Sequence, residues 1–238
     1  MLRNFAGEHC EVKSRLAQRI VAEGLGSALL LAAVIGSGIM GERLAGGNVA
    51  IALLANTIAT GAALVTLILA FGPISGAHFN PAVTLSALSQ RELSWWEALS
   101  YIVAQLIGAC AGALTANVMF GEPLVSFSRH ARHGGRQFFS ECIAAFGLIV
   151  VIRACAKYQP RVVAFAVGGY ITAAYWFTAS TSFANPAVTM ARSLSDTFAG
   201  IRPIDVPLFV VAQLIGAAAA TLLAMWLLAD CSPRDRHD

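Results

Sequence analysis

The stretch HFNPAVTLSA, at residues 78–87, is followed 105 residues later by FANPAVTMAR, at residues 183–192. Both contain Asn-Pro-Ala-Val-Thr, and both lie between long apolar runs. Asn-Pro usually marks a surface turn, which does not suit such surroundings. Asn is also a favoured helix N-cap, however, and Pro is favoured at the first helical position. We therefore interpret each copy as the start of a short helix.

The composition indicates a membrane protein. Of the 238 residues, 57% are hydrophobic and only 12% are charged, whereas soluble domains carry about 25% charged residues. So few charges cannot cover a globule of this size, and we expect the surface to face a lipid bilayer. The net charge of +3 and the lack of a basic stripe interleaved with aromatic residues give no sign of nucleic-acid binding.

Apolar runs of about 20 residues are expected to span the membrane. Six such runs occur, at residues 17–40, 49–71, 95–119, 137–156, 162–179 and 204–228. The first is too long for the core of a signal peptide, and we expect it to remain as a span.

A second repeat predicts how the spans are arranged. VAQLIGA occurs at residues 103–109 and 211–217, after each Asn-Pro-Ala copy, and Glu23 and Glu141 lie in the spans that open each half. We predict a single domain, residues 1–238, with half-repeats at about residues 17–120 and 137–229. Because each half has three spans, the second enters the membrane from the opposite side, which makes an inverted repeat.

The segments after the two Asn-Pro-Ala copies are too short to cross a bilayer. Non-helical backbone at membrane depth is tolerated only where protein buries it or where it lines a watery cavity. Half-helices entering from opposite faces would bring two partially positive N-termini together near the midplane. The expected fold class is therefore all-α, with six transmembrane helices and two re-entrant half-helices.

With these features the chain resembles the aquaporin, or major intrinsic protein, family over its full length. SGAHFNPAVT, at residues 75–84, is very similar to that family's first signature. The resemblance implies a passive channel rather than an enzyme, without a metal or other cofactor. It also implies a homotetramer with one pore per chain in the cell (inner) membrane.

The resemblance assigns roles at the middle of the pore. Its centre would be formed by Asn80, Pro81, Ala82, Asn185, Pro186 and Ala187. The two asparagines would donate amide N–H groups to the solute. His78 matches a pore-lining histidine, with a histidine packed inside its loop as the alternative. Glu23 and Glu141 resemble carboxylates that hold the re-entrant loops, with proton coupling as the alternative.

The sequence departs from the family at the narrow outer filter. Most members continue the second motif as Asn-Pro-Ala-Arg, but this chain has Val188, which removes a fixed charge and five donors. For the fifth-span position we favour Tyr175, with Ala173 and Ala174 as alternatives. The expected filter is Thr60, Tyr175, Ser182 and Val188. Such a ring is neutral and roomy, and it carries hydroxyl groups.

Arg192 lies four residues after Val188, one helical turn further out on the same face. It either replaces part of the missing charge at the pore mouth or is solvated or paired with Asp196. We favour the second interpretation.

We expect a passive channel for water, glycerol-like polyols and, by resemblance, neutral arsenicals such as arsenous acid. The alternatives are a strict water channel and a coupled secondary transporter, since inverted repeats are common among transporters. No catalytic motif or cysteine spacing supports an enzyme or a metal site.

The Lys and Arg residues predict the orientation, because cytoplasmic loops carry an excess of them. The side of the termini holds Arg3, Lys13, Arg15, Arg19, Arg91, Arg153, Lys157, Arg161, Arg234 and Arg236. The other side holds Arg43, Arg129, Arg132, Arg136, Arg192 and Arg202. We therefore expect cytoplasmic termini.

Overall fold

A computed structural model describes residues 14–229. The long helices are α1 (Leu16–Leu44), α2 (Val49–Ser75), α4 (Trp95–Met119), α5 (Gly135–Tyr158), α6 (Val163–Phe177) and α8 (Val206–Leu227). The short ones are α3 (Pro81–Ser89), α7 (Pro186–Arg192) and the 3-10 turns η1 (Pro160–Val162) and η2 (Pro203–Asp205). Arg3, Lys13, Arg234 and Arg236, which contribute to the predicted orientation, lie outside the described residues.

The structure confirms the predicted class of an all-α membrane protein. Five helices are long and apolar enough to cross a membrane: α1, α2, α4, α5 and α8 together with η2. The remaining expected span, α6, has 15 residues and follows directly on η1. Together η1 and α6 rise about 28 Å, close to the ~30 Å of a bilayer core. Large apolar side chains such as Leu25, Ile107 and Leu222 are exposed on the outside of the bundle.

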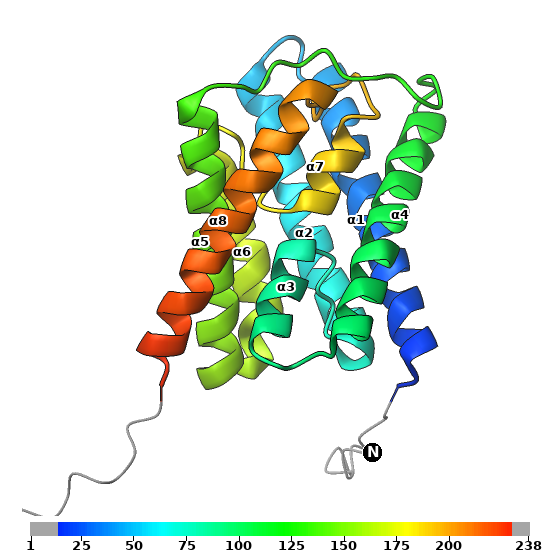
Figure 1. Ribbon diagram of the computed structural model, residues 1–238. Helices are drawn as coiled ribbons and strands as arrows, with labels where there is room; N and C mark the ends of the chain where they lie inside the picture. Colours follow the sequence, from blue (N-terminus) through cyan, green and yellow to red (C-terminus); the bar gives the residue numbers. More distant parts are fainter. Residues whose placement is uncertain (1–13, 230–238) are drawn as a thin grey trace, which may run out of the picture.

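The two short helices lie inside the bundle and enter it from opposite ends (Figure 1). The start of α1 and the end of α8 lie at one end, which we call the terminal end, and α3 occupies that half. The segment between α4 and α5 crosses the opposite end, which we call the loop end, and α7 occupies that half. The N-termini of α3 and α7 meet near the middle.

Each half-helix starts as the sequence predicts. The side-chain oxygen of Asn80 accepts a hydrogen bond from the backbone N–H of Ala82 at 2.9 Å, and Pro81 occupies the first helical position. Asn185 does the same for Ala187 at 2.9 Å. The Asn-Pro sequence therefore caps a helix N-terminus instead of forming a surface turn.

Candidate functional site

The loops before the two half-helices share an unusual backbone. Positive φ angles occur at Gly76, Ala77 and Phe79 and at the matching positions Thr181, Ser182 and Ala184. A residue other than glycine in this region costs about 1–3 kcal/mol unless its surroundings hold it in place. Both loops therefore need strong partners inside the protein.

Glu23 is that partner for the first loop. This fully buried carboxylate accepts hydrogen bonds from the backbone N–H of His78 at 2.9 Å and of Phe79 at 2.7 Å. The Ser75 hydroxyl, at 2.6 Å, and the Gln105 amide, at 2.7 Å, also donate to it. With four donors around it, the carboxylate holds the loop in its strained conformation.

Glu141 plays the same part in the second half. It is fully buried and accepts from the backbone N–H groups of Phe183 and Ala184, each at 2.9 Å. The amide of Gln213 donates to it at 2.6 Å.

Our sequence reasoning missed two glutamines that contact the candidate site. Gln105 donates to both Glu23 and the Thr84 hydroxyl, and Gln213 donates to both Glu141 and the Thr189 hydroxyl. Gln105 therefore links the Glu23 carboxylate to α3, and Gln213 links the Glu141 carboxylate to α7. The signal was available, because both are the glutamine of a VAQLIGA copy.

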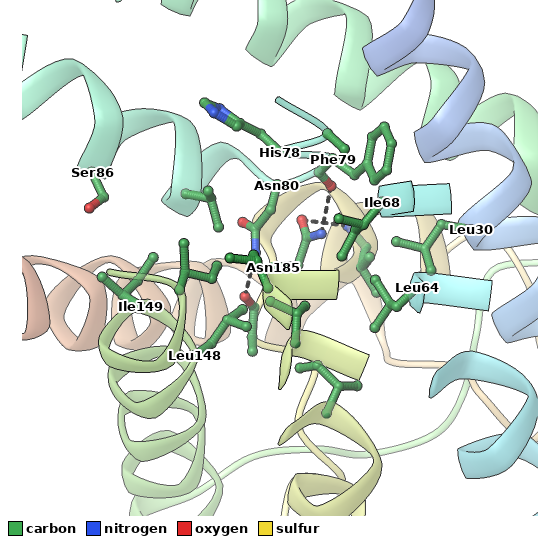
Figure 2. A pocket seen from close by; sticks show the side chains of 18 of the residues that line it. Leu30, Leu64, Ile68, His78, Phe79, Asn80, Ser86, Leu148, Ile149 and Asn185 are labelled. Carbon is green, nitrogen blue, oxygen red and sulfur yellow. Dashed lines mark hydrogen bonds between the residues drawn. The ribbon is translucent and has the colours of Figure 1, made fainter. Parts of the chain in front are cut away.

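The asparagine side chains join the two halves at the centre (Figure 2). The Asn80 amide donates to the carbonyl of Ala184 at 2.8 Å, and the Asn185 amide donates to the carbonyl of Phe79 at 2.8 Å. Each amide nitrogen carries two hydrogens, and these bonds use one. A second hydrogen therefore remains on each asparagine, beside a cavity that both residues line.

That cavity has a volume of about 430 Å³ and runs past the meeting point of the half-helices. Its lining includes Val188 and Arg192 in the loop-end half and Ser86 and Arg153 in the terminal-end half. Most of its wall is aliphatic, and Figure 2 shows Leu30, Leu64, Ile68, Leu148 and Ile149 around the asparagines.

His78 also lines the cavity, and it is half-buried. Its Nδ1 makes a hydrogen bond of 3.1 Å with the Thr84 hydroxyl, and its ring meets the edge of Tyr101 at a centroid distance of 5.5 Å. The histidine thus combines the two alternatives, since it is packed in its loop and also faces the cavity.

The four expected filter residues come together around the same cavity: Thr60, Tyr175, Ser182 and Val188. The hydroxyls of Thr60 and Tyr175 lie 3.2 Å apart and share a hydrogen bond. The Ser182 hydroxyl has no hydrogen-bond partner within the described chain. Tyr175 lines the cavity, whereas Ala173 and Ala174 do not.

Our favoured interpretation of Arg192 is wrong. Its side chain is 2% exposed, so it is not solvated. Its expected partner Asp196 instead accepts from the backbone N–H of Arg129 at 2.8 Å and lies 3.8 Å from the Arg129 Nε. The reason is that α7 ends at Arg192, so the helical i,i+4 relation does not extend to Asp196. Arg192 lines the cavity, as the other interpretation required.

A charged cluster at the terminal end was also missed. Arg153 donates to the Ser86 hydroxyl through Nη2 at 3.0 Å and is paired with Glu92 through Nη1. All three residues line the cavity. A lone arginine within an apolar run was a visible signal, because such a charge normally faces the interior of a bundle.

Comparisons with known proteins agree with this geometry. The profile of the Major intrinsic protein family matches residues 11–162 and 153–236. An aquaglyceroporin of Rhizobium meliloti, AqpS, is 52% identical over 92% of this chain and 93% of its own length. A probable aquaporin of Archaeoglobus fulgidus, AqpM, is 30% identical over 89% of this chain and 97% of its own.

A solved structure shares the fold. The aquaglyceroporin of Plasmodium falciparum superposes with a TM-score of 0.72, at 20% sequence identity, over 90% of this chain and 98% of its own.

Proposed function

Since the chain belongs to the major intrinsic protein family, we propose that the cavity between its half-helices is a passive pore, wider than that of a strict water channel. The protein is a multi-pass membrane channel for small neutral solutes and not an enzyme. The observation that carries the proposed width is the ring of Thr60, Tyr175, Ser182 and Val188 around one cavity.

The chemistry of this ring favours polyols over strict water selectivity. Val188 is short and apolar where most family members have arginine, so the passage is wider and lacks a fixed charge at that point. The hydroxyls of Thr60 and Tyr175 can exchange hydrogen bonds with a solute hydroxyl, whereas the Ser182 hydroxyl oxygen is fully enclosed. Glycerol-like polyols and un-ionised arsenous acid, which also carries three hydroxyls, fit such a ring. The relative named an aquaglyceroporin supports this width.

The inferred roles at the centre follow from the contacts around it. The free amide hydrogens of Asn80 and Asn185 replace the hydrogen bonds that a solute loses with its water shell. The surrounding Asn-Pro-Ala residues, Pro81, Ala82, Pro186 and Ala187, form the starts of the half-helices that position them. Glu23 and Glu141 are structural supports in this proposal, because donors already surround both carboxylates.

Orientation, domain organisation and assembly extend the proposal. The excess of Lys and Arg at the terminal end supports cytoplasmic termini in the cell (inner) membrane. The matching order of elements supports one domain of two inverted half-repeats, at about residues 17–120 and 137–229. We further propose a homotetramer with one pore per chain, on the basis of the family alone.

The experiment that tests the width is solute flux into proteoliposomes, followed by light scattering, for the wild type and Val188→Arg. The wild type should pass water, glycerol and arsenous acid. Overlap of a larger solute with the new side chain costs on the order of 1–3 kcal/mol, so glycerol and arsenous acid flux should fall roughly ten- to hundredfold relative to water.

Val188→Ala is the matched control, because it changes the same position without adding length or charge. It should keep the ratio of glycerol to water flux at or above the wild-type value. A wild type that passes water alone would show a strict water channel. An unchanged ratio in well-folded Val188→Arg would show that Val188 does not limit the passage.

A further inference from the structure

Arg192 is a buried cation without a counter-ion in the described chain. Its side chain is 2% exposed, and none of the ion pairs among residues 14–229 includes it. Its Nε donates to the carbonyl of Ala199, and its guanidinium lies 3.4 Å from the centre of the Phe183 ring. Buried charges are normally paired, so an unpaired guanidinium that lines the cavity needs an explanation.

A second guanidinium lies over the same ring. Arg132, from the segment between α4 and α5, places its guanidinium carbon 4.9 Å from the centre of Phe183. It donates to the carbonyls of Gly200 at 2.8 Å and Ser180 at 3.0 Å. These acceptors are neutral, and Arg132 likewise joins none of the described ion pairs. Burial lowers the pKa of Arg132 from its usual range, but arginine stays charged at neutral pH.

The nearby acidic groups do not neutralise this pair. Asp196 is paired with Arg129, and Asp205, which also accepts from the backbone N–H of Arg132 at 2.8 Å, is paired with the Arg202 side chain at 2.9 Å. The buried carboxylate of Glu141 attracts both arginines through space, but its oxygens accept from Phe183, Ala184 and Gln213, and it joins none of the described ion pairs. Two guanidiniums lie against the Phe183 ring, and Glu141 is one carboxylate, so an excess of positive charge remains in the loop that leads into α7. Charges in a low-dielectric wall act strongly on an ion in the adjoining passage.

The free donors of Arg192 face the passage. A guanidinium has five N–H donors, and only the Nε of Arg192 donates to a described residue. Its two terminal nitrogens make no hydrogen bond to a described residue, and they are not fully enclosed. They are therefore available to water or to a solute oxygen in the cavity that Arg192 lines.

We propose that Arg192, with Arg132 beside it, forms the cation barrier at the loop end of this pore. The inference rests on the proposed function, because it assigns charge selectivity to the same passage. The aliphatic Val188 leaves room for solutes, while the arginine one turn further out repels cations and donates hydrogen bonds to neutral solutes. Val188 thus sets the size limit of the pore, whereas Arg192 and Arg132 set its charge selectivity.

The test uses urea and guanidinium, which have nearly the same size and shape but differ in charge. Their fluxes are measured in proteoliposomes at low millimolar concentration, with the membrane potential held at zero. The wild type should pass urea and reject guanidinium. Removal of one nearby charge by Arg192→Gln should raise the ratio of guanidinium to urea flux about tenfold or more, and Arg132→Gln should raise it by less.

Arg129→Gln is the matched control, because the Arg129 side chain is 93% exposed and lies in the same segment as Arg132. Its flux ratio should equal that of the wild type. Each variant must elute from a sizing column like the wild type. If Arg192→Gln fails to fold, the ratio of guanidinium to urea flux measured for Arg132→Gln decides whether the inference holds.

The outcomes separate this inference from the proposed function. Unchanged ratios in the folded Arg192→Gln and Arg132→Gln variants would overturn the inference and assign cation rejection to the helix dipoles of α3 and α7. Equal urea and guanidinium flux in the wild type would also overturn it. A wild type that passes neither urea nor glycerol would refute the proposed function itself.

Discussion

At the scale of single residues, Asn80 and Asn185 each contribute to the fold and, in our proposal, to the passage. The side-chain oxygen of each caps its own half-helix, and one amide hydrogen binds the carbonyl before the other half-helix. Only the second amide hydrogen is left for a solute. A change at either residue therefore alters the junction of the two halves as well as the pore.

Asn185→Asp separates these roles, because aspartate still caps a helix but cannot donate. A carboxylate oxygen would then face the carbonyl of Phe79, which Asn185 now contacts at 2.8 Å. We expect the free energy of unfolding to fall by about 1–3 kcal/mol and glycerol flux to fall about tenfold or more. Thermal unfolding in detergent and flux in proteoliposomes measure the two effects.

The control is Asn48→Asp, at the exposed N-cap of α2, where the asparagine oxygen also accepts from two backbone N–H groups. Its stability and flux should match the wild type. Wild-type flux in folded Asn185→Asp would contradict a donor role for Asn185.

At the scale of helices, two pairs of closely packed helices support the site. α1 packs on α4 and α5 packs on α8, and each pair carries a glutamate on one helix and a glutamine on the other. A Cβ at Gly108 would lie 2.0 Å from the carbonyl oxygen of Gly24, and one at Gly216 would lie 2.2 Å from that of Cys142. The glycine of each VAQLIGA copy thus lets two helix backbones meet, which brings Gln105 and Gln213 to their carboxylates.

Gly216→Ala should therefore destabilise the protein, because the new methyl group collides with the backbone of α5 and cannot be relieved by a side-chain rotation. We expect a loss of about 1–3 kcal/mol, measured as a lower unfolding temperature in detergent. Gly169→Ala is the control, since nothing lies within 4 Å of its added Cβ and alanine favours a helix. Equal unfolding temperatures for the two variants would contradict this account of the helix contact.

At the scale of the whole molecule, hydrogen bonds between the two half-helices join the halves of the bundle at its centre. The half-helices enter from opposite ends of the bundle. Each asparagine side chain donates a hydrogen bond of 2.8 Å to a backbone carbonyl of the other half, and these two bonds hold the junction together. The buried carboxylates that a coupled transporter could use for protons, Glu23 and Glu141, already accept hydrogen bonds from the loops and the glutamines. Neither carboxylate is left free to couple the movement of a solute to that of a proton, which favours passive conduction.

Flux of glycerol should accordingly rise linearly with its gradient, and it should not respond to membrane potential or to changes in pH around neutrality. Proteoliposomes with an imposed potassium or proton gradient provide the measurement, and empty liposomes provide the background. Saturation at low glycerol concentration together with acceleration by a proton gradient would favour the coupled transporter.

The sequence by itself determined the features that depend on local chemistry and on repetition. Apolar runs of span length, the Asn-Pro helix starts and two repeated motifs were sufficient to predict the class, the half-helices and their opposed entry. The four residues expected to form the filter, Thr60, Tyr175, Ser182 and Val188, line one cavity, and their role as a filter stays a prediction.

Only the tertiary structure decided which partners distant residues find. The hydrogen bonds donated by the Asn80 and Asn185 side chains join residues that are 104 and 106 positions apart in the sequence. The Arg153–Ser86 hydrogen bond joins residues that are 67 positions apart. Arg192 shows the limit of local reasoning, because helical spacing to Asp196 applies only while the helix continues, and α7 ends at Arg192. Beyond that point the packing of Phe183 and Ala199 directs the side chain toward the passage. A side chain at a helix end takes its direction from whatever the fold places beside it, and sequence spacing does not encode this.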